Sequence, residues 1–199
     1  MQKGNGDLAP TQERVLSAAA RLFRTKGYAA TTTREIAAEL GIQKASLYYH
    51  ISSKEDVLYQ LCLESMREHL EGLQAADDGP GDVLSRLRAA VDGQMARLHS
   101  DSDRNAAALL ELRALDPERH TTVVGMRDEY EARLREVVQE AQAAGVLRTD
   151  LDAKYLTLSL LSLINWSIFW FRPNGRLRAD QLAALMFDIY LKGARRPPD

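Results

Sequence analysis

A short segment near the N-terminus, residues 43–50 (QKASLYYH), carries side chains that can read and hold nucleic acid. Glutamine, lysine and serine side chains can hydrogen-bond to base edges or phosphates, and an alanine methyl can contact a thymine methyl. Tyrosine, histidine and the nearby Lys54 suit phosphate oxygens, and Thr33 offers a hydroxyl to a further phosphate. The predicted DNA-contacting residues are therefore Thr33, Gln43, Lys44, Ala45, Ser46, Tyr48, Tyr49, His50 and Lys54.

Capping signals and one glycine predict the helices that position these side chains. A first helix follows the apolar spacing of residues 15–23, and a second begins after the T-x-x-E capping box at Thr32–Glu35. It ends at Gly41, whose backbone can make a tight turn, and a third short helix fits Lys44–His50. The residues 53–56 (SKED) repeat the capping signal and start a long fourth helix. Two short helices joined at a glycine are typical of a helix-turn-helix that docks into a DNA major groove.

Charge is divided unevenly along the chain of 199 residues. Its formal net charge is −2, whereas residues 1–54 contain eight Lys and Arg against four Asp and Glu, a net charge of +4 that leaves −6 for the remainder. This division fits phosphate binding by the first part only. A composition of 45% hydrophobic and 27% charged residues indicates a globular chain rather than a disordered one.

Cysteine usage and hydropathy indicate a cytoplasmic protein without a membrane span. The single cysteine, Cys62, can form no intrachain disulfide, which suits a reducing compartment. The N-terminus lacks the apolar core of a signal peptide. The most apolar run, Leu156–Phe171, is interrupted by Ser and Asn and is shorter than the about 20 residues of a membrane helix. We expect it to be a buried helix.

The rest of the chain continues in helical spacing, after a clear break at residues 77–81 (DDGPG). We expect further helices over residues 84–98, 104–115, 117–145, 152–171 and from about 180 onward. No segment alternates as a strand does. The predicted fold class is all-α, with about nine helices.

The N-terminal segment closely resembles the DNA-binding domain of the TetR (tetracycline-repressor-like) family of bacterial transcriptional regulators. The resemblance covers residues 11–58 and rests on Ala19, Phe23, Gly27, Tyr28, Thr32, Thr33, Ile36-Ala37, Gly41-Ile42, Leu47-Tyr48, His50, Ser53-Lys54-Glu55 and Leu58. It implies a homodimer that binds palindromic operator DNA, usually as a repressor, with Lys44–His50 as the recognition helix. Tyr49 and Lys54 match family positions that usually hold phosphate. The resemblance also implies a DNA-binding domain at residues 1–54 and a ligand-binding and dimerisation domain at 55–199.

The residues of the second domain permit both of these roles. The apolar run Leu156–Phe171 and the apolar stripe of the last helix can pack against their symmetry mates as a four-helix interface, or can instead complete the core of a monomer. The pocket should lie among the middle helices, where Arg113 and Asn165 are polar groups within apolar runs and need partners. The predicted ligand-binding residues are Met95, Leu109, Arg113, Met126, Tyr130, Asn165, Trp166 and Phe169.

The C-terminal half resembles TetR-family regulators of lipid and steroid catabolism that respond to acyl-CoA thioesters. The resemblance rests on residues 112–132 (LRALDPERHTTVVGMRDEYEA), 145–152 (GVLRTDLD) and 165–177 (NWSIFWFRPNGRL). It implies an acyl-CoA effector, whose phosphates arginines such as Arg113, Arg119 and Arg172 can meet. The alternative is a regulator of an efflux pump that responds to lipophilic cationic drugs, for which Glu111 is the candidate carboxylate.

No sequence pattern supports catalysis, a cofactor or a metal site. The four histidines are scattered, no Walker or Rossmann glycine pattern is present, and Cys62 fits a core position better than that of a nucleophile. We therefore expect no enzyme activity. A helical adaptor without DNA binding is a further class, and it predicts no salt-dependent binding to DNA.

Overall fold

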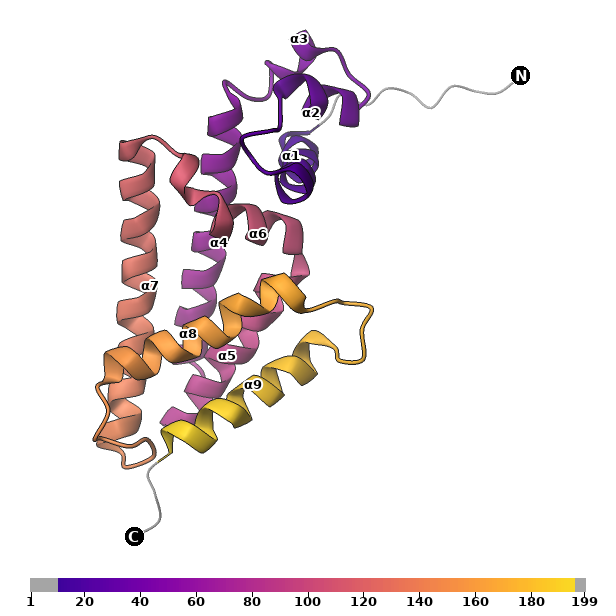
Figure 1. Ribbon diagram of the computed structural model, residues 1–199. Helices are drawn as coiled ribbons and strands as arrows, with labels where there is room; N and C mark the ends of the chain where they lie inside the picture. The colour runs from indigo at the N-terminus through magenta and orange to yellow at the C-terminus, as the bar shows by residue number, and fades with distance from the viewer. Residues whose placement is uncertain (1–10, 196–199) are drawn as a thin grey trace. The chain divides into compact units, whose positions relative to one another are not determined.

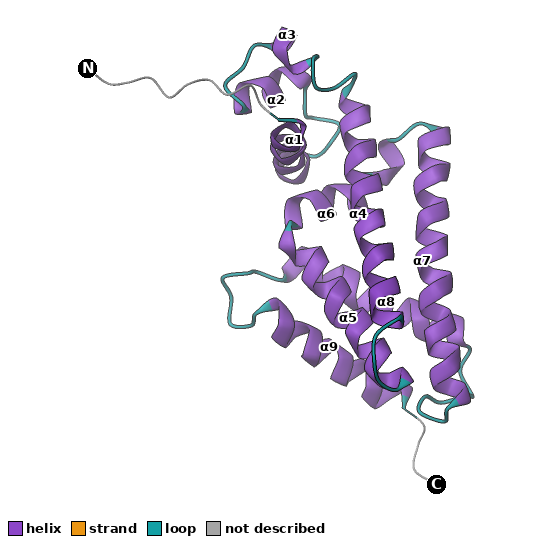
Figure 2. Cartoon of the chain, turned by 180° about the vertical axis from the view of Figure 1, so that it is seen from behind, coloured by secondary structure: helices purple, strands orange, loops and turns teal. Residues whose placement is uncertain are grey.

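The computed structural model describes residues 11–195, and this range is helical with connecting turns and no strand (Figures 1 and 2). The α-helices are α1 (Gln12–Lys26), α2 (Thr33–Glu39), α3 (Lys44–Leu47), α4 (Lys54–Asp77), α5 (Val83–Ser100), α6 (Ser102–Leu110), α7 (Pro117–Ala143), α8 (Ala153–Trp170) and α9 (Ala179–Ala194), with a 3-10 helix η1 (Leu112–Ala114). The prediction of an all-α fold with about nine helices is confirmed for the described range. Among these helices none has both the length and the apolar character of a membrane span.

The described chain forms two compact units. The first contains the residues up to Leu63 together with Asp103–Arg119, and the second contains Glu64–Ser102 and the chain from His120 onward. This division is not a single cut in the sequence, because the distant segment Asp103–Arg119 joins the N-terminal helices. The predicted functional boundary at residue 54 stays a prediction.

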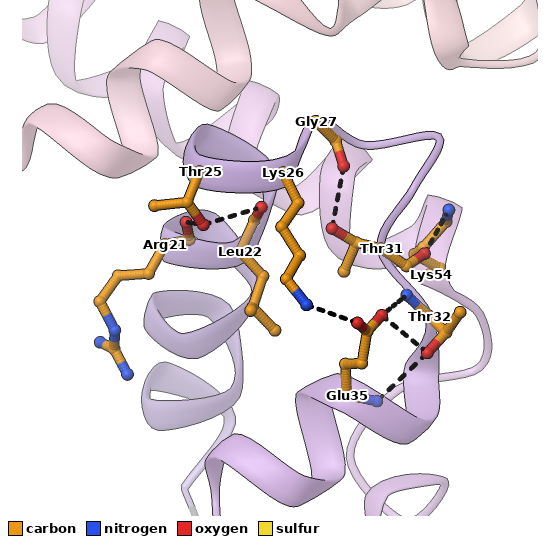
Figure 3. A network of polar contacts seen from close by, with 9 residues as sticks. All are labelled: Arg21, Leu22, Thr25, Lys26, Gly27, Thr31, Thr32, Glu35 and Lys54. Carbon is orange, nitrogen blue, oxygen red and sulfur yellow. Dashed lines mark hydrogen bonds and ion pairs between the residues drawn. The ribbon is translucent and has the colours of Figure 1, made fainter.

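Local capping explains the helices of the first unit. Thr32 Oγ1 accepts the N–H of Glu35, and the Glu35 carboxylate accepts the N–H of Thr32, so both halves of the predicted capping box are present. Figure 3 shows this pair together with Lys26, whose ammonium donates to Glu35 at 2.6 Å. The turn from α2 to α3 passes through Gly41 with φ +70°, a left-handed conformation that favours glycine.

Two helices of the first unit are shorter than predicted. The recognition helix, predicted over Lys44–His50, ends at Leu47, because the N–H groups of Tyr49 and His50 donate to carbonyls three residues back and tighten the last turn. The helix predicted over residues 104–115 ends at Leu110 and continues as η1 after Glu111, whose φ of −100° and ψ of 8° leave the α-helical region.

The second unit is built on the packing of α5, α8 and α9 against one another. On α8, residues Leu156, Leu160, Ile164 and Ile168 recur every four positions and are buried. The opposite side of α8 is exposed in the single chain, so the helix is buried on one face only and not on all sides as its composition suggests.

Candidate functional site

The side chains of α3 that the sequence singles out for DNA contact lie at the surface of the first unit. Gln43, Lys44 and Ala45 are exposed, and Ser46 and His50 are half-buried. The Tyr49 side chain is 88% exposed, whereas Leu47, on the other side of α3, is fully buried. The short helix therefore presents hydrogen-bonding groups on one side and is anchored by its apolar side.

The start of α2 lies beside this surface through one tyrosine. The hydroxyls of Thr33 and Tyr48 are 3.5 Å apart, and the Lys44 ammonium lies 5.7 Å from the centroid of the Tyr48 ring. The hydrogen bond with Thr33, followed by the positive charge of Lys44, lowers the pKa of Tyr48. The half-buried Thr33 and the exposed Lys44 and Tyr48 thus form a continuous patch that joins α2 to α3, as the predicted DNA contacts require.

Lys54 has a different environment from the other predicted phosphate contacts. Its ammonium donates to the carbonyls of Tyr28 and Thr31, both at 2.7 Å, and lies 4.1 Å from the centroid of the Tyr28 ring. Partial burial lowers the pKa of Lys54. Two of its three N–H groups therefore hold the loop between α1 and α2, and one remains for another acceptor.

The segment Asp103–Arg119 is fastened to the N-terminal helices by charged side chains. The Glu111 carboxylate accepts the Tyr28 N–H at 3.2 Å, and the Glu55 carboxylate accepts the Asp116 N–H at 2.7 Å. Arg119 pairs with Asp56 at 3.3 Å, and its guanidinium lies 5.0 Å from the centroid of the Tyr59 ring.

These contacts join positions as many as 83 residues apart, and sequence reasoning missed them. The sequence predicts Glu55 and Asp56 as part of a helix start and Glu55 also as part of the family pattern, and the helix start is present, because the Asp56 N–H donates to Ser53 Oγ. The carboxylates of the first turn of α4 therefore hold both their own helix and the segment that contains η1.

A polar cluster lies in the interior of the second unit. Gln94 is 4% exposed; its Oε1 accepts the Tyr130 hydroxyl at 2.8 Å, and its Nε2 donates to Asn165 Oδ1 at 3.2 Å. The buried His69 packs edge-on against the Tyr130 ring, with centroids 6.1 Å apart. We call His69, Gln94, Tyr130 and Asn165 the polar cluster. Beside Gln94, Met95 is fully buried.

The structure brings only some of the predicted ligand-binding residues together. Met95, Tyr130 and Asn165 lie in or beside the polar cluster. Trp166 and Phe169 face outward from α8, with 63% and 53% of their surface exposed, and their ring centroids are 4.6 Å apart.

The remaining predicted ligand-binding residues lie elsewhere. Leu109 and Arg113 belong to the first unit, where Arg113 is exposed, and Met126 is a half-buried residue of α7. Sequence reasoning missed His69 and Gln94. Gln94 is a polar residue within the apolar face of α5, the signal by which Asn165 was found.

The outer face of α8 and α9 forms an apolar groove. It is lined by Tyr155, Leu158, Ser159, Ser162, Leu163, Trp166, Trp170 and Met186. Leu185 and Ile189 of α9 are also exposed in the single chain, at 44% and 49%. Contiguous apolar surface of this kind is typical of an interaction surface. In the described range no group of three or more His, Cys, Asp or Glu side chains is arranged to hold a metal ion.

Comparison with known proteins agrees with this arrangement over most of the chain. Residues 15–61 match the family of bacterial regulatory proteins, tetR family, and residues 80–194 match the tetracyclin repressor-like, C-terminal domain. The HTH-type transcriptional repressor KstR2 of Mycolicibacterium smegmatis is 30% identical over 194 residues, which cover 93% of this chain and 91% of the relative.

Two solved structures show the same fold at similar identity. The TetR family transcriptional regulator PfmR from Thermus thermophilus has a TM-score of 0.83 and 32% identity, covering 92% of this chain and 100% of that one. AibR in complex with isovaleryl coenzyme A and operator DNA has a TM-score of 0.80 and 29% identity, covering 89% of this chain and 96% of that one. The chain therefore belongs to the TetR family of bacterial regulatory proteins.

Proposed function

We propose that this protein is a transcriptional repressor that binds operator DNA and releases it when a small molecule, an acyl-CoA thioester, binds. The observation that carries DNA binding is the surface patch of Thr33, Lys44 and Tyr48 beside the exposed Gln43 and Tyr49. Lysine and glutamine supply donors for base edges or phosphates, with the charge of Lys44 suited to a phosphate, and the hydroxyls at the start of α2 also suit phosphate. Ala45, Ser46 and His50 complete this surface, and Lys54 contributes mainly by holding the loop before α2.

We propose that the protein acts as a homodimer through the outer face of α8 and α9. The exposed side chains of this face include Trp166, Phe169 and Trp170, and a patch of large apolar side chains in water marks an interaction surface. A second copy with the same face would cover them as a symmetric four-helix interface. Such a dimer presents two recognition helices to a palindromic operator, with half-sites about 34–36 Å or a multiple of that apart.

One solved relative supports the acyl-CoA class of effector. The crystal structure of AibR contains isovaleryl coenzyme A and operator DNA, so a protein of this fold binds both kinds of partner. The alternative effector, a lipophilic cation, needs a buried carboxylate. Glu111 was the candidate, but its carboxylate accepts the N–H of Tyr28 within the first unit, which leaves it poorly placed for that role.

We propose that release works through two segments of the first unit, the start of α4 and the segment Asp103–Arg119. The first continues into the second unit within α4, and the other is connected to it at the start of α6 and within α7. Effector binding in the second unit shifts these segments, and the contacts of Glu55 and Glu111 transmit the shift to the start of α4 and to Tyr28. Only a difference in effector affinity between the two forms can drive such a change.

A titration of labelled DNA from beside the protein's own gene tests the function. The purified protein should bind this DNA more tightly than a scrambled sequence, with an affinity that falls as salt rises, and octanoyl-CoA should release it. Absence of salt-dependent binding would leave the adaptor class as the better description. Binding without release by any acyl-CoA would contradict the effector class alone, and hydrolysis of the thioester during the assay would contradict the absence of enzyme activity.

A further inference from the structure

A permanent positive charge lies beside the polar cluster in the second unit. Arg97 follows Gln94 by three residues on α5, so the two side chains share one side of the helix. Burial is the main cause that lowers the pKa of His69 and raises that of Tyr130, and the charge of Arg97 lowers both. The guanidinium of this α5 residue therefore acts on groups of α4 and α7.

Two glycines inside helices make room for this guanidinium. A Cβ on Gly72 of α4 would overlap the Arg97 guanidinium, and a Cβ on Gly93 of α5 would lie 2.6 Å from its Nη1. Glycine is among the least favourable residues in the interior of a helix, yet it stands at both positions against which the guanidinium lies. Residues that reduce folding stability are often found at functional sites. Two helix-interior glycines that leave room for one guanidinium are therefore more typical of a binding site than of a packed core.

The chemistry of this arrangement suits one class of ligand. A guanidinium presents a rigid fork of donors that matches the two oxygens of a carboxylate or phosphate. The Tyr130 hydroxyl donates its hydrogen to Gln94, but each amide of the polar cluster has two N–H donors, and Gln94 uses one of them for Asn165. The amides of Gln94 and Asn165 can therefore donate to oxygens of a ligand. The fully buried Met95 and Leu98, which is 3% exposed, belong to the apolar side of α5 and suit a hydrocarbon chain.

We infer that Arg97, held in the cradle of Gly72 and Gly93, binds the oxyanion of an amphipathic acyl effector, with the amides of Gln94 and Asn165 as neighbouring donors. The inference rests on the proposed function, because it takes the second unit to be the effector-binding part. It adds the residue and the chemical group that the effector must present. The oxyanion can be the phosphate of an acyl-CoA or the carboxylate of a free fatty acid.

Binding measured directly on the full-length protein by isothermal titration calorimetry separates this inference from operator release. The probes are octanoyl-CoA, dodecanoate and the neutral octanoyl N-acetylcysteamine thioester, which has an acyl chain without an oxyanion. The variants are Arg97→Met, which removes the fork, and Gly72→Ala, which keeps the charge but displaces the guanidinium. The matched control is Gly125→Ala in α7, also inside a helix, where an added Cβ meets no atom within 4 Å.

The inference predicts that Arg97→Met and Gly72→Ala weaken the binding of at least one oxyanionic probe roughly tenfold or more, the usual effect of losing a charge-assisted hydrogen bond. Gly125→Ala should bind as the wild type does, and any binding of the neutral thioester should be the same in all four proteins. Weaker binding of octanoyl-CoA alone identifies the phosphate as the oxyanion, and weaker binding of dodecanoate alone identifies the carboxylate.

Three results would overturn the inference: unchanged oxyanion affinity in Arg97→Met, equal losses in Gly72→Ala and Gly125→Ala, or no binding of either oxyanionic probe to the wild type. A probe that binds through Arg97 but does not release operator DNA would contradict the proposed release mechanism and leave the inference intact.

Discussion

The two compact units expose opposite kinds of surface. The first exposes polar side chains on and beside α3, where Gln43, Lys44 and Tyr49 face water. The second exposes aromatic side chains on α8, where Trp166 and Trp170 are 63% and 47% accessible. Polar donors find few hydrogen-bond partners on an apolar protein surface but many on DNA. Exposed aromatic rings, in contrast, are stabilised most when a protein partner covers them. The two surfaces therefore favour different partners, DNA for the first unit and a second copy of the protein for the second.

The polar contacts within the two units also differ in kind. Charged contacts in the first unit, such as Glu111 with Tyr28, fasten one segment of chain to another. The second unit buries Gln94 and Tyr130 as a hydrogen-bonded pair inside an apolar bundle. Burying a polar group costs free energy unless the group finds a hydrogen-bond partner, and Gln94 and Tyr130 meet this need through each other. We assign the first set to transmission and the second to ligand recognition.

Breaking the apolar surface should have the largest effect. Trp166→Glu places a charge in the groove of α8 and α9 and should convert the dimer to a monomer, because an unpaired carboxylate cannot be buried there. Operator affinity should fall by roughly 100-fold or more, since two linked half-site contacts become one. Sedimentation velocity gives the mass and fluorescence anisotropy gives the affinity. Gln139→Glu, an exposed position on α7, is the control; a Trp166→Glu protein that stays dimeric would refute the assigned interface.

Removing a donor from the polar surface should have the next effect. Lys44→Ala should weaken operator binding and reduce the slope of log affinity against log salt by about 1, as expected for one lost phosphate contact. The protein should remain dimeric. Lys154→Ala, an exposed lysine of the second unit, should change neither quantity. Equal effects of the two substitutions would mean that the surface of α3 is not special.

The contact between Glu111 and Tyr28 distinguishes transmission from binding. Glu111→Ala removes the acceptor of a backbone N–H and should cost about 1 kcal/mol of stability. The ratio of operator affinities without and with octanoyl-CoA should fall toward 1, whereas the affinity without effector should change less than threefold, by about 0.7 kcal/mol at most. Glu111→Gln keeps an acceptor oxygen and should retain most of the ratio. If both variants release DNA as the wild type does, the effect of the effector travels by another route.

The smallest effect concerns the capping box of α2. The hydrogen bond from Lys26, followed by those from Thr32, lowers the pKa of Glu35 from 4.5 to about 2. Because the pKa is lower in the folded state, the stabilisation is full above pH 4.5 and is lost as the pH falls toward 2. The difference in melting temperature between the wild type and Glu35→Ala should therefore be largest near neutral pH and should shrink below pH 4.5. A difference independent of pH would mean that the charge of Glu35 contributes nothing.

Local signals make the N-terminal helices of the first unit predictable from the sequence, whereas contacts between distant positions are not predictable in either unit. Thr32 and Glu35 are three residues apart, and a capping box is visible in the letters alone. The hydrogen bond between Gln94 and Tyr130 joins residues 36 positions apart on two helices, and no spacing rule connects them. Trp166 and Phe169 were placed in a pocket because aromatic side chains indicate burial, but the sequence does not say whether the same chain or a partner covers them.

Hydrogen exchange of the intact protein with and without operator DNA reports on both surfaces at once, and so tests the assignment of DNA to the surface around α3 and of the second copy to the outer face of α8 and α9. Under this assignment, DNA should slow exchange in the segments containing Thr33 and residues 43–50, with no comparable change in α8 and α9. The assignment would be contradicted if DNA protected the outer face of α8 and α9 while exchange in residues 43–50 stayed the same.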